Sequence, residues 1–254
     1  SLILPKNATV LDARFNITGY QRDQEFLGYF NSGVNQGDRY GSVVRNLGDN
    51  NGDGLDEIIY GSPYSDTETG ITYIMNGASS LYSLSGTTTH SRFGSSFSGV
   101  FDNQSGEDLL AIGATTNTFL KTGSVMVYNY TAPNRLTLFD TLDGNDTDDL
   151  FGSQIEAGDI DADGEDELII SSPAANSNKG KVYVLDVGKA DADFSPDSHL
   201  KFVINGSATD TNFGKSMALG DMNGNGYPDL AVGSDQEVKL YLGSIDFDAT
   251  EEHA

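Results

Sequence analysis

The stretch "FGSQIEAGDIDADGEDELIISSP", residues 151–173, begins with an aromatic-Gly pair, continues into an acidic loop and ends in an apolar run. The same three parts occur, with variations, four times along the chain. The aromatic-Gly pairs are Tyr40-Gly41, Phe93-Gly94, Phe151-Gly152 and Phe213-Gly214. Self-similarity of this kind is the signature of a repeat architecture. We therefore expect one structural unit for each copy.

A polar, Gly-containing loop follows each aromatic-Gly pair. The four loops are "DNNGDGLDE" (49–57), "FDNQSGEDL" (101–109), "DIDADGEDE" (159–167) and "DMNGNGYPD" (221–229). Each loop leads into a short apolar stretch: "IIYGSP", "LAIGAT", "LIISSP" or "LAVGSD". Short apolar runs bounded by turn residues are consistent with buried strands.

Alternating segments follow the apolar runs. They are "GITYIM" (70–75), "GSVMVY" (123–128), "GKVYVL" (180–185) and "EVKLYL" (237–242), and a further strand pattern follows in the first three units. Period-two alternation with β-branched and aromatic residues predicts half-buried strands, and helical periodicity is weak throughout. About four strands in roughly 50 to 60 residues is the size of a propeller blade. The sequence thus predicts an all-β β-propeller with four visible units, approximately 40–92, 93–150, 151–212 and 213–245, either as a four-bladed ring or as part of a larger propeller.

The two ends of the chain bear on how the ring would close. The fourth unit lacks an outer strand, because only "IDFDATEEHA" follows "EVKLYLGS". The segment "EFLGYFNSGVNQGDRYG" (25–41) resembles the segment before the fourth unit and would complete the last blade, which gives a propeller domain over 25–254. Residues 1–24 form an N-terminal extension with strand character. Two interpretations stay open: a strand exchanged with a neighbouring molecule, or an edge strand or blade remnant within its own chain.

The composition excludes several classes of partner and site. Asp and Glu number 38 against 14 Lys and Arg, which gives a formal charge of −24 and argues against nucleic acid or an anionic membrane. The absence of cysteine excludes disulfides and thiolate metal sites. No run approaches the roughly 20 apolar residues of a membrane span, and the start of the chain lacks the pattern of a signal peptide. Cations are the natural counterparts of so acidic a chain.

Three of the four loops carry the oxygen ligands that calcium prefers. Calcium takes about 6 to 8 oxygens from carboxylates, amides, backbone carbonyls and water. Counting from the first Asp, oxygen-bearing side chains stand at the first, third, fifth and ninth places, Gly stands at the sixth, and the seventh offers its carbonyl. The candidate ligands for about three Ca²⁺ ions are Asp49, Asn51, Asp53, Leu55 and Glu57; Asp159, Asp161, Asp163, Glu165 and Glu167; and Asp221, Asn223, Asn225, Tyr227 and Asp229.

This spacing differs from that of an EF-hand, which needs a bidentate acid at the twelfth place and flanking helices. Here the twelfth places hold Tyr60, Ile170 and Val232, so we expect a calcium loop within a β-hairpin. Magnesium suits the loops less well, because it requires a tight octahedral shell. The second loop has Phe101, Ser105 and Leu109 at ligand places, and we expect no strong site there.

The combined pattern of aromatic-Gly pair, Asp-rich loop and "YGSP"-like run resembles the FG-GAP repeats of integrin α-subunit β-propellers, over residues 25–245. The resemblance implies calcium loops at one end of the blades and partner contacts at the other. The implied contact segments are 63–69, 87–92, 115–122, 143–150 and 173–179. Integrin propellers have seven blades and this chain shows four, and no inserted adhesion domain separates its second and third units. The implied function is an adhesion, partner-binding or self-assembly module for a protein or glycan ligand.

A propeller-type polysaccharide lyase or a lectin is the alternative function. The chain has only His90, His199 and His253, each expected in a polar or terminal context, which disfavours a His-based zinc centre. The loop cations Arg92, Lys121, Arg135 and Lys179 are expected to be solubilising surface charges. We therefore predict that the protein is not an enzyme.

Six Asn-x-Ser/Thr sequons favour an extracellular or cell-surface setting and make glycosylation possible. They stand at Asn7, Asn16, Asn103, Asn129, Asn145 and Asn205. The absence of thiols and the predicted calcium loops agree with this setting. Adaptation to salt is a second explanation for the acidity.

Overall fold

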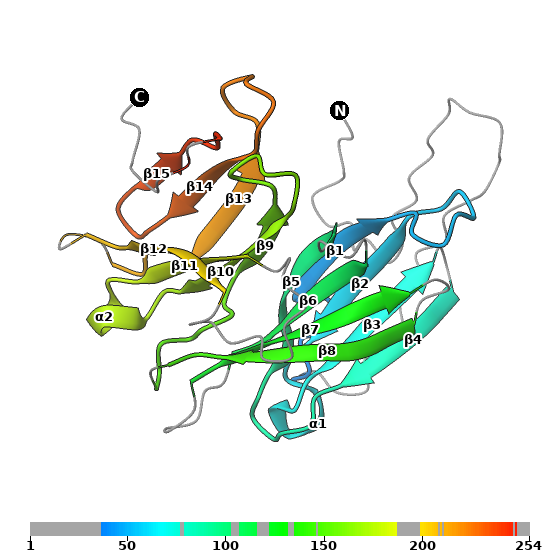
Figure 1. The fold of residues 1–254 in the computed structure, drawn as a ribbon. Coiled ribbons are helices and arrows are strands. Elements are labelled where there is room, and N and C mark those ends of the chain that lie inside the picture. The colour runs from blue at the N-terminus through cyan, green and yellow to red at the C-terminus, as the bar shows by residue number, and fades with distance from the viewer. Residues whose placement is uncertain are drawn as a thin grey trace, which may run out of the picture. The chain divides into compact units, whose positions relative to one another are not determined.

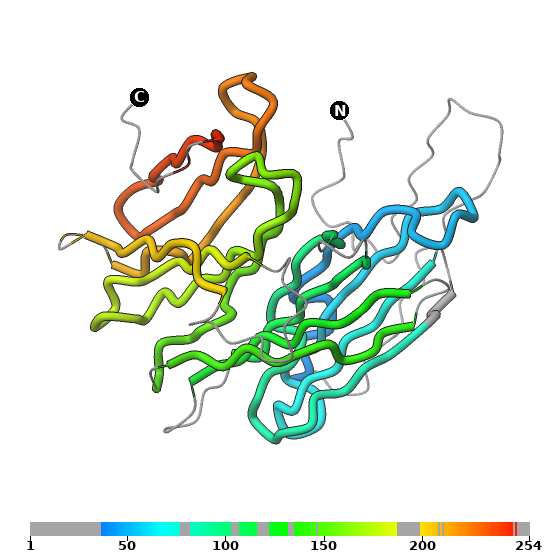
Figure 2. The backbone as a smooth tube through the Cα atoms, in the orientation of Figure 1, coloured from blue at the N-terminus to red at the C-terminus, as the bar shows by residue number. Residues whose placement is uncertain are grey.

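The computed structural model describes residues 37–76, 79–102, 107–115, 122–131, 135–145, 147–186, 199–207, 209, 211–245 and 247. All of them belong to one compact unit, Gly33–Ala254. The strands form four antiparallel sheets, each in simple chain order (Figure 1). Figure 2 follows the backbone from the first sheet in blue and cyan to the last in orange and red.

The first and second sheets have four strands each. The first contains β1 (Val43–Gly48), β2 (Glu57–Ser62), β3 (Ile71–Asn76) and β4 (Ser79–Ser85). The second contains β5 (Phe93–Asp102), β6 (Asp108–Ala114), β7 (Ser124–Thr131) and β8 (Arg135–Asp143).

The third sheet also has four strands, and the fourth has three among the described residues. The third contains β9 (Ile155–Gly158), β10 (Glu167–Ser172), β11 (Lys181–Asp186) and β12 (Leu200–Asn205). The fourth contains β13 (Ser216–Gly220), β14 (Asp229–Gly233) and β15 (Val238–Tyr241). The prediction of an all-β propeller with four units is confirmed. The extension 1–24 and residues 25–36 of the segment expected to complete the fourth sheet lie outside the described residues, so the domain boundaries stay predictions.

The second strands of the second and third units, β6 and β10, are buried because sheets pack on both of their faces. In β10 all six residues are buried. Leu168 and Ile170 join a core shared with the second sheet, whereas Ile169 joins a core shared with the fourth. Alternating side chains of a strand point to opposite faces. A continuous apolar run is therefore what a strand between two sheets requires, which explains "LAIGAT" and "LIISSP".

The aromatic-Gly pairs of the second, third and fourth units pack each of these sheets against the sheet before it. Phe93, Phe151 and Phe213 are each at most 1% exposed, and each lies in a different one of the three cores. Gly180, at the start of the third strand of its unit, has φ +87°, and a Cβ there would lie 2.1 Å from the carbonyl oxygen of Phe213. Only glycine permits that approach and that backbone conformation. The repeat motif therefore encodes contact between neighbouring sheets.

The innermost strands β1, β5, β9 and β13 contact one another in that order. Arg45 of β1 joins three of them. Its guanidinium forms an ion pair with Glu156 of β9 and donates to the carbonyl oxygens of Phe97 (3.2 Å) and Ile155 (3.4 Å). One side chain thus connects the first, second and third sheets.

The two short segments α1 (Ser65–Glu68) and α2 (Ala175–Asn178) connect the second and third strands of their units. Neither is a regular right-handed helix, because φ is positive from Asp66 to Glu68 and from Asn176 to Asn178. No helix among the described residues is long and apolar enough to cross a membrane.

Candidate functional site: three acidic loops

The three acidic loops share one hydrogen-bond network around the aspartate at the first place. In the third loop Asp159 accepts hydrogen bonds from the backbone N–H groups of Asp163 and Gly164, both at 3.1 Å. Asp49 accepts from Asp53 and Gly54, at 3.1 and 2.8 Å, in the first loop, and Asp221 accepts from Asn225 and Gly226, at 3.1 and 2.9 Å, in the fourth. The first aspartate therefore shapes each loop through its own backbone.

The acid at the ninth place anchors the loop to the sheet. Glu57, Glu167 and Asp229 are each at most 1% exposed and each begins the second strand of its unit. Each accepts a hydrogen bond from the N–H of the second loop residue, at 3.0, 3.1 and 2.8 Å respectively. Buried carboxylates require partners or a counter-charge, so these acids make the loop interior the centre of the candidate site.

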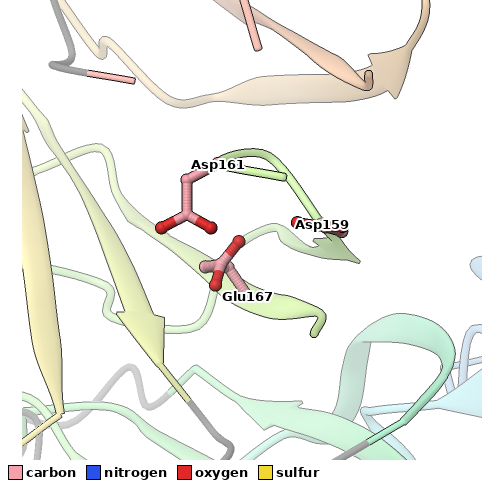
Figure 3. A group of neighbouring side chains, drawn as sticks. All are labelled: Asp159, Asp161 and Glu167. Carbon is pink, nitrogen blue, oxygen red and sulfur yellow. The ribbon is translucent and has the colours of Figure 1, made fainter. Parts of the chain in front are cut away.

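The third loop brings its carboxylates closest together. One oxygen from each of Asp159, Asp161 and Glu167 lies within 4.8 Å of the others, and Figure 3 shows these side chains in the loop. Asp161 Oδ1 and Glu165 Oε2 are buried atoms with no hydrogen-bond partner. An oxygen-rich set with unpartnered buried oxygens fits a hard cation such as calcium. The side chains of the third loop therefore fit a calcium ion.

Lys201 of β12 occupies the interior of the third loop. Its Nζ donates to Asp161 Oδ2 (2.7 Å), Asp163 Oδ2 (2.9 Å) and Glu167 Oε1 (2.8 Å). These acceptors belong to three of the side chains predicted as metal ligands. Sequence reasoning missed Lys201, because it lies 34 residues beyond Glu167 in a strand whose pattern gives only alternation.

The acids of the first and third loops have shifted pKa values. Burial raises the pKa of Glu167 to about 7 against the opposing effect of Lys201. Burial also raises the pKa of Glu57, and the Asn76 amide lowers the pKa of Asp53. A carboxylate that is difficult to ionise in a dry loop is stabilised by a neighbouring cation.

Amide groups provide part of the interior in the other two loops. In the first loop Asn51 Nδ2 donates to Glu57 (2.6 Å), and Asn76 donates to Asp53 and leaves its own Oδ1 buried without a hydrogen-bond partner. In the fourth loop Asn223 Nδ2 donates to Asp229 (3.3 Å). In both loops the side chains predicted as ligands from their spacing therefore lie close to one another.

The second loop is built differently. Phe101 and Leu109, at the first and ninth places, are buried in the core between the second and third sheets. They pair across β5 and β6, and Ser105 lies outside the described residues. Apolar side chains therefore fill the places that carry acids in the other loops.

At the opposite end of the strands, two pairs of the predicted contact segments touch: 63–69 with 87–92, and 143–150 with 173–179. Arg92 donates to Glu68 Oε2 (2.9 Å), and the Tyr64 ring has Arg39 at 4.0 Å and Arg92 at 4.7 Å from its centroid. Arg92, expected to be a solubilising surface charge, is paired with Glu68 and lies over the Tyr64 ring. Segments 143–150 and 173–179 are joined by a hydrogen bond from the Ala174 N–H to the Asp149 carbonyl (3.2 Å).

Several other predicted positions can be located. Asn145 and Asn205 are exposed, and Asn129 is partly buried within β7. His199 is only 3% exposed, and its carbonyl accepts a hydrogen bond from the Asp186 N–H (2.8 Å). The predicted positions outside the described residues are Asn7, Asn16, Asn103, Lys121, His253 and residues 116–120.

Comparison with known proteins agrees with this architecture. The FG-GAP repeat model matches residues 151–185 and 213–246. Integrin alpha-5 of Xenopus laevis is 32% identical over 200 residues, covering 74% of this chain and 19% of that protein. Integrin alpha pat-2 of Caenorhabditis briggsae is 30% identical over 209 residues, covering 74% and 17%.

Integrin alpha-4 of Xenopus laevis is 28% identical over 215 residues, covering 80% of this chain and 20% of that protein. The chain thus spans about a fifth of the length of these relatives. The family match falls on the third and fourth units, each of which contains one of the acidic loops described above. The chain is therefore an FG-GAP repeat protein with an integrin-like β-propeller.

Proposed function

We propose that the protein is an extracellular, calcium-stabilised propeller that binds a protein or glycan partner as an adhesion or assembly module. The observation that carries this proposal is the threefold recurrence of one loop geometry, with a buried acid at the ninth place of each loop. Each loop lies at the end of the first and second strands of its unit. The calcium loops would therefore fix the hairpins, and the opposite end would remain available for a partner.

Calcium would be held by the side chains at the first, third, fifth and ninth places and by the seventh carbonyl. Bound calcium supplies the positive charge that the clustered carboxylates lack. A ligand that binds only the folded state stabilises it by mass action. Removal of calcium should consequently lower the melting temperature and loosen the hairpins that carry the loops.

The opposite end has features suited to a partner. Three consecutive non-glycine residues have positive φ in each of α1 and α2, with values from 50° to 67°. Conformations of this kind are costly and concentrate at functional sites. The Arg39, Tyr64 and Arg92 cluster adds aromatic surface and positive charge to a strongly acidic protein. Together with the integrin relatives and the sequons, these features support partner binding at the cell surface.

The first test is the number of calcium ions bound per chain, measured by equilibrium dialysis with metal analysis. We expect a value of about three and a higher melting temperature in calcium than in a chelator. Asp159→Asn and Asp221→Asn should each reduce the number by about one. A value near zero in the folded protein would contradict calcium stabilisation.

Partner binding is tested by coating a surface with the calcium-loaded protein and measuring attachment of cells and of beads carrying the same protein. Tyr64→Ser should reduce attachment if the opposite end makes the contact, whereas Leu138→Ser, at an exposed position of β8, should not. Deletion of residues 1–24 tests self-assembly, and an unchanged oligomeric size would contradict it. Release of unsaturated sugars from an acidic polysaccharide would favour a lyase instead.

A further inference from the structure

We propose that Lys201 is a built-in competitor for calcium in the third loop. In the calcium-free protein its ammonium group holds the loop closed, and calcium must displace it to bind. The third loop should therefore have weaker calcium affinity than its own ligands would give without Lys201. This inference rests on the proposed calcium binding and adds a residue that regulates one of the sites.

The hydrogen bonds of Lys201 define the competition. An ammonium group has three N–H donors, and here all three point to carboxylates, at 2.7, 2.9 and 2.8 Å. The acceptors stand at the third, fifth and ninth places of the loop, which are three of the four side-chain places expected to bind calcium. Lys201 is 18% exposed and Glu167 is 1% exposed, so water screens this interaction little. Calcium and the ammonium group cannot occupy the same position.

The sheet geometry explains why Lys201 reaches the loop. In the pairing of β11 with β12, Val184 lies opposite Phe202 and Leu185 lies opposite Leu200, so Lys201 is left without a direct partner in the register. An extra residue of this kind forms a β-bulge, which redirects a side chain. The bulge places Lys201 beside the loop of its own sheet.

The same bulge recurs in the other four-stranded sheets. The pairing of β7 with β8 omits Phe139, and the pairing of β3 with β4 omits Leu81. Phe139 packs against the core that contains Phe101 and Leu109, the apolar residues of the second loop. The bulge residue is apolar in the second unit, whose loop has Phe101 and Leu109, and cationic in the third, whose loop is acidic.

The first loop offers an internal comparison, because its unit has leucine at the bulge position. The donors described above for its carboxylates are backbone and amide groups, so among the described residues no ammonium group competes with calcium there. Filling would begin at loops without the lysine, and the third loop would remain ordered when calcium is scarce. Lys201 would give the three loops different calcium thresholds.

The test compares the calcium-binding isotherms of the wild type with those of Lys201→Met and Lys179→Met. Lys179 is exposed at the other end of the strands, so its substitution removes the same charge without altering the loop. We expect Lys201→Met to tighten one site by roughly ten- to hundredfold, the range that corresponds to one charged hydrogen-bond set. Lys179→Met should leave all sites within about threefold of the wild type, because long-range charge effects are screened.

Asp159→Asn identifies the affected site, because it should remove the site that Lys201→Met tightens. Melting temperatures give a second readout. In a chelator Lys201→Met should melt below the wild type, and saturating calcium should reverse that loss. If Lys201→Met fails to fold without calcium, Lys201→Gln retains a polar end and allows the same comparison.

The outcomes separate this inference from the proposed function. A wild type that binds no calcium overturns the calcium proposal itself. A wild type that binds about three ions, with the same three affinities in Lys201→Met, overturns only the role of Lys201. An equal effect of Lys179→Met would also overturn it, because general charge would then explain the change.

Discussion

At the scale of single residues, the acid at the ninth place of each loop uses one carboxylate oxygen to bind the loop backbone and the other to bind a second group. Glu167 begins β10 and accepts a hydrogen bond from the Ile160 N–H, while its other oxygen faces the loop interior and Lys201. A shorter acid serves at Asp229, which accepts from Met222 and from the Gly243 N–H (2.9 Å). The ninth residue therefore couples the state of the loop to the stability of a buried strand.

Asp108 gives a prediction for pH dependence. Partial desolvation of its carboxyl group, together with the neighbouring Asp102 carboxylate, raises the pKa of Asp108, although the residue as a whole is exposed. The folded state therefore binds this proton more tightly, and the associated stability is present below the unfolded pKa of about 3.8 and lost as the pH rises through the folded pKa. Asp108→Asn should increase the free energy of unfolding at pH 7, by less than about 1 kcal/mol because the side chain is exposed.

Urea unfolding at pH 3 and pH 7 in the presence of a chelator measures this effect. The gain from Asp108→Asn should be smaller at pH 3, where the wild-type carboxyl is protonated. Glu107→Gln removes the neighbouring exposed charge and serves as the control. An equal gain at both pH values would show that the acid-acid contact with Asp102 is not its cause.

The residue scale also shows what the sequence could predict about the candidate site. The loop acids follow one another within nine positions, so spacing alone identifies them and predicts that they converge. Lys201 approaches from a strand distant in sequence, and a β-bulge aims it. A bulge depends on the register of two paired strands. No pattern within the segment containing Lys201 indicates that register.

At the scale of elements, the glycine just before the third strand of each of the first three units lies against the aromatic residue of the next unit. Gly70, Gly123 and Gly180 all have positive φ, and a Cβ on any of them would lie within 2.5 Å of a backbone oxygen of Phe93, Phe151 or Phe213. Alternation and turn residues predicted these strands. The left-handed turns α1 and α2 were not predicted, because positive φ at Thr67 or Ser177 opposes the local preference of those residues and is imposed by the surrounding contacts.

Gly180→Ala tests the contact between units. We expect a loss of about 3 kcal/mol in the free energy of unfolding, which combines overpacking against Phe213 with backbone strain. Gly48→Ala is the matched control, because Gly48 has a similar φ of +81° and nothing within 4 Å of the added Cβ. It should cost only about 1 kcal/mol from strain. Equal losses in chemical denaturation would mean that backbone strain, and not the contact with Phe213, requires glycine at position 180.

At the scale of the whole molecule, three cores between successive sheets give the propeller its continuity. The second and third sheets each present one face to the sheet before and the other to the sheet after, as Leu168 and Ile169 of β10 illustrate. The repeat pattern predicted this order of sheets. Arg45 was not predicted, because its contacts with β5 and β9 join segments 52 to 111 residues apart. Such contacts arise from the arrangement of the sheets and leave no local signal.

The Arg45–Glu156 pair should stabilise the inner strands, and a double-mutant cycle measures its contribution. Arg45→Met should cost about 2 kcal/mol, because it leaves a carboxylate that is 13% exposed without its partner and removes two bonds to backbone carbonyls. Glu156→Gln should cost less, since those carbonyl bonds remain. We expect a coupling energy of about 1 kcal/mol for the pair.

The exposed pair Lys215–Asp235 provides the comparison for that cycle. Its side chains are 45% and 40% exposed, and its coupling energy should be below about 0.5 kcal/mol. High salt should weaken the Lys215–Asp235 coupling more than the Arg45–Glu156 coupling, because water and ions reach the inner strands less. If the two cycles gave equal energies with equal salt dependence, Arg45 would act as an ordinary surface charge. The link among β1, β5 and β9 would then rest on apolar packing alone.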